Sequence, residues 1–153
     1  MSWTPLWFGK HKGKTLPQIL FSDPNWFFWA TEEKVFDDKG VITDEARELD
    51  RKARNIRIPS DEGEDMVVEY YIHKPTGKFQ DMRRAPRNRE DRNYTIRRNV
   101  IDLSIPRKIS PYDKQGCKSL VSDLKFYFFG DSKYRMTKAR CEAFFDNDDN
   151  FML

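Results

Sequence analysis

The stretch that decides the fold of this chain lies near its N-terminus, where residues 7–16 read WFGKHKGKTL and residues 23–29 read DPNWFFW. The first part places four cationic or potentially cationic side chains around two glycines, and the second is the densest aromatic run in the chain. Glycine adopts the positive φ of a tight turn and lets a backbone approach a partner closely. We therefore predict a hairpin over residues 5–15, whose crowded cations favour a bound anion such as phosphate.

Capping and periodicity signals predict helices on both sides of this hairpin. We expect a turn or two of helix over residues 16–21, and then a helix with Asp23 as N-cap and Pro24 at its first position, running to about Lys34. Apolar residues at helical spacing predict a further amphipathic helix that Thr43 caps, with arginines on its outer face.

The middle of the chain reads as strands and the end as helices. We expect strands over residues 66–72 and 78–82 around a turn at 74–77, and a third strand over 94–105 that Pro106 ends. Helices should follow from a Ser110-x-x-Asp113 cap and from Thr137. Gly130 should close the first of them, and a frayed acidic tail should occupy residues 146–153.

Size and composition fit an intracellular globular protein. The chain has 153 residues, of which 38% are hydrophobic and 35% charged, so its 12 Phe, 6 Tyr and 4 Trp must dominate the core. We predict an α+β fold with a small helical N-terminal lobe containing the Gly/Lys hairpin, an antiparallel sheet, and two C-terminal helices packed on it. Residues 1–40 would form the lobe and residues 41–153 the α+β portion, together one compact unit.

Charge is unevenly distributed, although the formal net charge is only +3. The segment 83–98 has a net charge of +5, whereas residues 141–153 have −4 and contain no Lys or Arg. Such a basic middle predicts a surface for a polyanion, and arginine favours bidentate phosphate contacts. The arginines that we expect to form this phosphate-binding arm are Arg83, Arg84, Arg87, Arg89, Arg92, Arg97 and Arg98.

The N-terminal pattern resembles the exodeoxyribonuclease-X-like C-terminal domain family. In that family a Phe-Gly-Lys-(aromatic or His)-Lys-Gly-Lys hairpin precedes a helix, a Pro-containing turn and a Tyr/Trp-x-x-Trp helix, and the resemblance covers residues 5–33. It implies an accessory role in nucleic-acid processing, with Lys10, Lys12 and Lys14 as contacting positions and His11 at a variable one. DNA is the expected ligand, with RNA as the alternative, and a DNA-processing protein would be a further partner.

The aromatic run has two interpretations. Trp26, Trp29 and Ala30 share one side of their helix, which favours core packing. Phe28 points away from that side, so it is the ring best placed to stack on an exposed base.

Catalytic signatures are weak. The glycines of the hairpin do not have the spacing of a phosphate-binding P-loop, which excludes nucleotide triphosphate hydrolysis by that route. Glu69 and Asp102 lie on predicted strands and are candidates for the paired carboxylates of a metal-dependent nuclease. The histidines and the cysteines Cys117 and Cys141 are too scattered for a zinc site, and we expect no cofactor or metal.

Three functions from different classes remain. We favour a non-enzymatic nucleic-acid-binding accessory protein that engages phosphates through the hairpin and the arginine arm, brought together by folding into one groove. The alternatives are a protein–protein adaptor or inhibitor that uses the aromatic lobe and the acidic tail with its Phe-Met-Leu tip, and a metal-dependent nuclease that uses Glu69 and Asp102. The absence of a secretion signal and of a long apolar run predicts a cytoplasmic protein without a membrane partner.

Overall fold

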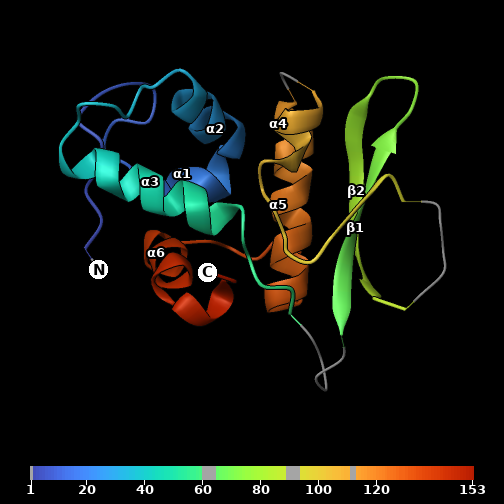
Figure 1. The fold of residues 1–153 in the computed structure, drawn as a ribbon. Helices are drawn as coiled ribbons and strands as arrows, with labels where there is room; N and C mark the ends of the chain where they lie inside the picture. The colour runs from blue at the N-terminus through green and yellow to red at the C-terminus, as the bar shows by residue number, and fades with distance from the viewer. Residues whose placement is uncertain (1, 60–64, 89–93, 111–112) are drawn as a thin grey trace.

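The structure is a computed structural model that describes residues 2–59, 65–88, 94–110 and 113–153. Helices and an antiparallel sheet make it an α+β protein, as predicted. Figure 1 shows a helical group on one side, the sheet on the other, and a long helix, α5, standing between them. The helical group contains α1 (Leu16–Ser22), α2 (Pro24–Glu32), α3 (Val41–Ala53) and α6 (Lys138–Asp146).

The start of α2 confirms the expected cap. The Asp23 carboxylate accepts a hydrogen bond of 3.4 Å from the Trp26 amide, and Pro24 occupies the first helical position. Pro at this position loses no hydrogen bond, because the first amides of a helix have no partner within it. The helix ends at Glu32, two residues before the predicted end at Lys34.

Helix α3 begins at Val41, so the prediction that Thr43 caps it is wrong. The Thr43 hydroxyl donates to the Phe36 carbonyl at 2.6 Å and accepts from the Lys39 amide at 2.9 Å. This side chain therefore fastens the preceding loop to the helix. Gly40 precedes the helix at a φ of +61°, a conformation that favours glycine.

The sheet has the strand order β2-β1-β3 with antiparallel pairing throughout. Strand β1 (Met66–His73) and strand β2 (Lys78–Pro86) flank the expected turn, in which Gly77 has a φ of +68°. Strand β2 is longer than predicted, because Arg83 and Arg84 pair with Glu69 and Val68 of β1. The prediction that this strand ends at residue 82 is therefore wrong, since it continues to Pro86.

The predicted strand over 94–105 is mostly replaced by other structure. Only β3 (Ile96–Arg98) pairs with β1, and Ile101 makes an isolated bridge to Ile56. Pro106 does not end a strand, because it stands in the first turn of α4 (Ile105–Ile109). Proline, with its φ fixed near −65°, suits both the end of a strand and the first turn of a helix, so Pro106 by itself does not distinguish them.

Helix α5 (Lys114–Phe129) connects the sheet to the helical group. Its N-cap is Asp113, which accepts from the Gly116 amide at 2.8 Å and from the Phe79 amide of β2 at 3.0 Å. The predicted cap at Ser110 is wrong, since Ser110 ends α4. Gly130 closes α5 in the left-handed conformation, as expected.

The two C-terminal helices differ in what they cover. Helix α5 packs on β2, whereas α6 packs on α1 in the helical group, so only one of them lies on the sheet (Figure 1). Thr137 caps α6 through a hydrogen bond from the Arg140 amide, as predicted. Side chains from residues 1–40 and 41–153 share one hydrophobic cluster that runs from Trp3 to Phe151.

The acidic tail is docked rather than frayed, which corrects the prediction for residues 146–153. After the 3-10 turn η2 (Asp148–Asn150), Phe151 is 2% exposed and its backbone pairs with Ile56. Its ring lies 5.7 Å from the ring of Phe145 and nearly parallel to it, at 17°. Burial of this ring outweighs the repulsion among the acidic residues, and Lys52 offsets part of that repulsion through an ion pair with Asp148 at 3.1 Å.

Truncation of Phe151 should therefore destabilise the whole protein. We expect Phe151→Ala to lower the free energy of unfolding by about 3–5 kcal/mol, the usual cost of removing a buried aromatic ring. Met152→Ala is the control, because that side chain is 46% exposed and its removal should change stability by about 0.5 kcal/mol or less. Urea denaturation measures both, and equal stabilities for the two variants would contradict the docked tail.

Candidate nucleic-acid interface

The glycine–lysine segment forms a closed loop between Leu6 and Lys14. The Leu6 amide donates to the Lys14 carbonyl at 3.0 Å, and the Gly13 amide donates to the Leu6 carbonyl at 2.8 Å. Gly9 and Gly13 have φ values of +77° and +90°, which side chains other than glycine rarely adopt. The predicted turn is thus present, although its two arms are too short to be strands. We call residues 5–15 the hairpin.

The cations of the hairpin fall into two groups. Lys10 lies 3.3 Å from the Asp23 carboxylate, and His11 is only 9% exposed with its Nε2 at 3.0 Å from the same oxygen. The His11 ring also meets Trp26 edge-on, so it is a packed residue rather than a contacting one. Lys12 and Lys14 are exposed and make no ion pair within the described part of the chain.

Asp23 holds the hairpin against α2. Burial alone would raise the pKa of its carboxyl group, but hydrogen bonds from His11, Lys10 and the Trp26 amide together hold this pKa below its ordinary value of 3.8. The carboxylate is therefore ionised near neutral pH. One charge serves as the cap of a helix and as the anchor of the loop before it.

The aromatic run is buried differently from the prediction. Phe28 is 1% exposed, and the Arg54 guanidinium covers its ring at 5.2 Å, so its proposed stacking on a base is wrong. Helix α2 contacts α1, α3 and α5, which leaves little of its circumference to solvent. The exposed ring is that of Trp29, at 40%, and Trp26 beside it is half-buried.

The predicted arginine arm is distributed over several elements. Arg83 and Arg84 lie in β2, Arg97 and Arg98 in β3, and Arg87 just after β2. The remaining members, Arg89 and Arg92, lie outside the described residues.

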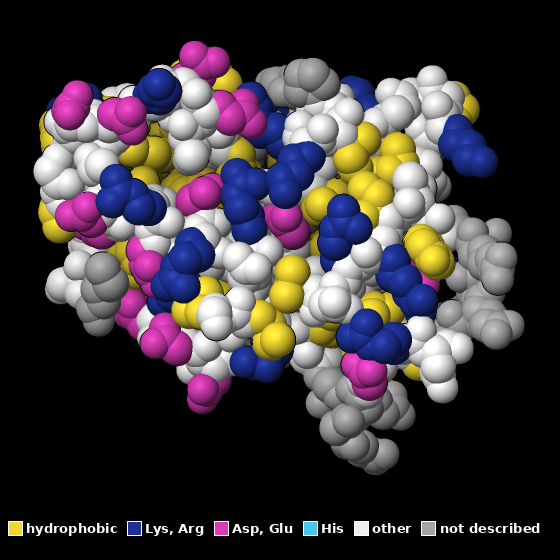
Figure 2. Space-filling model, in the orientation of Figure 1, with side chains coloured by type: hydrophobic (Ala, Val, Ile, Leu, Met, Phe, Trp, Pro, Cys, Tyr) yellow, Lys and Arg dark blue, Asp and Glu magenta, His cyan; other side chains and the backbone are white. Residues whose placement is uncertain are grey.

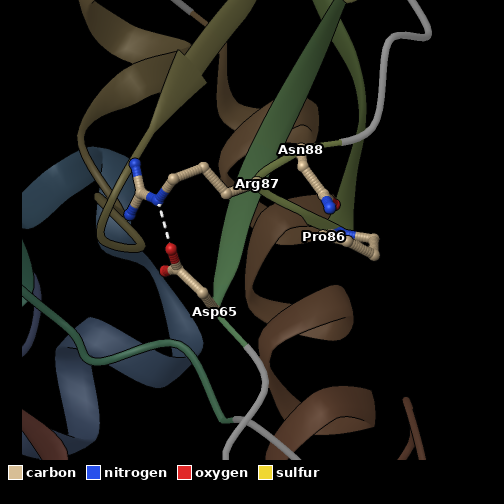
Figure 3. Close-up of a pocket in the computed structure, with 4 residues that line it drawn as sticks. All are labelled: Asp65, Pro86, Arg87 and Asn88. Atoms are coloured by element: carbon tan, nitrogen blue, oxygen red, sulfur yellow. Dashed lines mark hydrogen bonds and ion pairs between the residues drawn. The ribbon is translucent and has the colours of Figure 1, made fainter.

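Most of these arginines face acceptors of the chain itself. Arg83 lies 3.0 Å from Asp81, and Arg97 lies 3.6 Å from the buried Glu69. Figure 3 shows the Arg87 guanidinium turned toward the Asp65 carboxylate, at 2.7 Å, beside a cavity of about 400 Å³. Arg84 donates to the Pro59 carbonyl and lies over the Tyr127 ring at 5.3 Å.

The hairpin and the arginine segment do not form one groove. In Figure 1 the hairpin lies beside α2 and α3 at one end of the molecule, and β2 and β3 lie at the other, with α5 between them. Figure 2 shows Lys and Arg side chains over both halves of one face, with Asp and Glu among them most densely over the helical half. The expected convergence of the two positive segments is therefore wrong.

The sequence interpretation missed a basic hollow that includes one end of the hairpin. It has a volume of about 440 Å³ and joins Lys14 of the hairpin to Lys125 of α5 and to Lys133 and Arg135 of the α5–α6 loop. None of the described residues that line it is acidic, and none of these four cations has an ion pair with a described carboxylate. We call it the basic hollow.

Aromatic contacts hold the loop that supplies two of these cations. The Tyr134 ring stacks on Phe129 at 4.5 Å and 18°, and the Arg140 guanidinium lies 4.7 Å from the centre of the Tyr134 ring. Tyr134 itself lines the basic hollow. A sequence signal was available, because residues 125–140 contain five Lys or Arg against Asp131 alone, a net of +4.

The candidate nuclease carboxylates serve separate structural roles. Glu69 is 1% exposed on β1 and faces Arg97 and Tyr71. Asp102 lies after the bridge of Ile101 rather than on a strand, and accepts from Ser104 at 2.6 Å and from Lys108 at 3.0 Å.

Both thiols are buried, and the described residues form no metal-binding cluster. Burial raises the pKa of both Cys117 and Cys141 to about 12, so neither is a thiolate near neutral pH. Among the described residues, no group of three or more His, Cys, Asp or Glu side chains could hold a metal ion.

Comparison of the chain with protein-family models, curated protein sequences and solved structures found no match. The resemblance of residues 5–33 to the exodeoxyribonuclease-X-like C-terminal domain family therefore stays a prediction. Within the described ranges, no helix is long and apolar enough to cross a membrane.

The anchoring role of Asp23 predicts a pH-dependent effect of Asp23→Asn. Asn also caps helices, so the variant removes the charge and keeps the cap. We expect a loss of about 1 kcal/mol near pH 7, because hydrogen bonds to an ionised group are lost. Folding lowers the pKa of Asp23 below its unfolded value near 3.8, so the ionised carboxylate stabilises the protein at a pH above that value. This stabilisation is lost as the pH falls through the pKa of Asp23 in the folded state.

The measurement is urea denaturation of both proteins between pH 7 and pH 3. The gap in stability should be largest above about pH 5 and should close below about pH 3.8. A gap that stays constant over this range would contradict an anchoring charge on Asp23.

Proposed function

We propose that this chain is a non-enzymatic nucleic-acid-binding accessory protein of the cytoplasm, with DNA as its expected ligand. One observation carries the proposal: the basic hollow gathers cations from the hairpin, from α5 and from the α5–α6 loop, and its described lining contains no carboxylate. The contacting residues would be Lys12, Lys14, Lys125, Lys133 and Arg135. Of these, Lys125, Lys133 and Arg135 take the place of the arginine arm that was predicted from the sequence.

Electrostatics supports this assignment. Cations that gather in a concave surface raise the local positive potential and attract a polyanion. Each Lys or Arg that neutralises a phosphate releases condensed counterions, so affinity depends steeply on salt. With about five contacts, binding to duplex DNA should weaken by about 500-fold between 50 and 200 mM salt, and binding to a single strand somewhat less.

The ring of Tyr134 orders the lining of the basic hollow. Because Tyr134 is already stacked on Phe129 and covered by Arg140, it is held in place before a ligand arrives. The hollow therefore combines phosphate-binding cations with an ordered aromatic residue.

The other candidate functions have less support. An adaptor that uses the acidic tail would need a free Phe-Met-Leu tip, and Phe151 is buried in the core. A nuclease built on Glu69 and Asp102 would need both carboxylates at one site, and each has different partners. A DNA-processing protein as a partner is implied by the family resemblance alone.

A fluorescence anisotropy titration tests the proposal. Labelled single-stranded and double-stranded DNA, and RNA of the same sequence, are titrated across salt with the wild type and with Lys133→Gln/Arg135→Gln. We expect salt-dependent binding by the wild type, and for the double variant weaker binding whose slope of log affinity against log salt is smaller by about 2.

The matched control is Arg47→Gln/Arg51→Gln on α3. It makes the same change in net charge, but these arginines pair with Asp44 and Glu48 on the exposed face of the helix. This control should bind as the wild type does. No binding at 50 mM salt, binding that ignores salt, or equal effects of the two double variants would contradict the proposal.

A further inference from the structure

A further cavity, of about 330 Å³, opens beside α2, and none of the proposed phosphate contacts lines it. Trp26 and Trp29 of α2 line it, together with Lys10 of the hairpin and Lys114, the first residue of α5. Its volume is within the range of small-molecule sites, about 300–1,000 Å³. We call it the tryptophan cavity.

The indole rings make the apolar part of this cavity. Trp29 is 40% exposed, although α2 buries its neighbours Phe27 and Phe28. The ring centroids of Trp26 and Trp29 lie 6.4 Å apart with a tilt of 43°, so they do not stack on each other face to face. At least the exposed indole keeps a π face on which a flat ring can stack.

Asn25 supplies a directed polar group. The residue is 7% exposed and lines the cavity, and its Oδ1 accepts from Arg107 Nη1 at 3.1 Å. Arg107 is in turn fixed by Glu32, at 2.9 and 2.7 Å, which sets the orientation of the amide. Among the hydrogen bonds of the described residues, none uses Asn25 Nδ2, so a buried amide offers donors to a ligand.

Two ammonium groups supply the charge. Lys114 lines the cavity and has no ion pair with any carboxylate that the structure describes. Lys10 shares the Asp23 carboxylate with His11 and keeps a side chain that is 58% exposed. Asp23, which also lines the cavity, thus faces one lysine and one histidine, and the Lys114 ammonium is left to attract an anion.

We propose that the tryptophan cavity binds a nucleotide. The nucleobase stacks on Trp29 beside Trp26, and Asn25 Nδ2 donates a hydrogen bond to an acceptor on the edge of the base. The phosphate lies between Lys114 and Lys10. The ligand is a free mononucleotide or the phosphorylated end of a strand, which share this chemistry. The inference does not depend on the proposed role of the basic hollow.

Isothermal titration calorimetry with four ligands provides the test. The ligands are nucleoside 5′-monophosphates, the corresponding nucleosides, inorganic phosphate, and a short DNA strand with or without a 5′-phosphate. If base and phosphate are both recognised, the monophosphate should bind at least about tenfold more tightly than the nucleoside or phosphate alone. Tight binding of only the 5′-phosphorylated strand would identify the strand end as the ligand instead.

Three single variants locate the site. Trp29→Ala and Lys114→Gln should each weaken nucleotide binding about tenfold, while Trp7→Ala should not, since Trp7 is 53% exposed outside the cavity. Circular dichroism shows whether each variant is folded. If Trp29→Ala does not fold, Lys114→Gln still tests the site. Lys133→Gln/Arg135→Gln should bind the monophosphate normally, which separates this inference from the proposed function.

Two results would overturn the inference. The first is that neither a monophosphate nor a phosphorylated strand end binds to the folded wild type. The second is that Trp29→Ala and Lys114→Gln, both folded, bind the nucleotide as tightly as Trp7→Ala does.

Discussion

The carboxylate of Asp23 is the interaction on which the site depends. It caps α2 by accepting a hydrogen bond from the Trp26 amide, and it is hydrogen-bonded to both Lys10 and His11 of the hairpin. The loop is therefore held at the start of a helix whose other side is part of the core. With the loop fixed in this way, Lys10 lines the tryptophan cavity and Lys14 lines the basic hollow. One ionised group thus positions cations for two surfaces.

Accessible charge in this protein does not follow local net charge. The arginines of residues 83–98 lie on strands, and antiparallel pairing sets Glu69 opposite both Arg83 and Arg97. Cross-strand neighbours of opposite charge attract, so the sheet satisfies much of its own positive charge. Residues 125–140 have a smaller net charge, but they lie at a helix end and in a loop where few carboxylates approach. The segment with the lower net charge therefore contributes more cations that have no ion pair with a described carboxylate.

Local signals in the sequence predicted the local features of the fold. Positive φ at Gly9 and Gly13, the Asp23-Pro24 helix start and the Gly130 helix end all depend on the chemistry of one or two residues. Errors arose where the outcome depends on distant contacts. The tail docks because Phe151 fits against Phe145 and Ile56, and Phe28 is buried because α2 has neighbours on several sides. The basic hollow escaped prediction because Lys14 and Lys133 are far apart in sequence, although the charge of residues 125–140 was visible.

The central claim is that a polyanion binds at the hairpin and the α5–α6 loop rather than at the sheet. Amide chemical shifts in an NMR titration with a short DNA strand test it directly, because they report each part of the chain in one experiment. The account predicts shifts at residues 12–14, 125 and 133–135 that diminish as salt is added. Shifts confined to residues 83–98, or none at low salt, would contradict it.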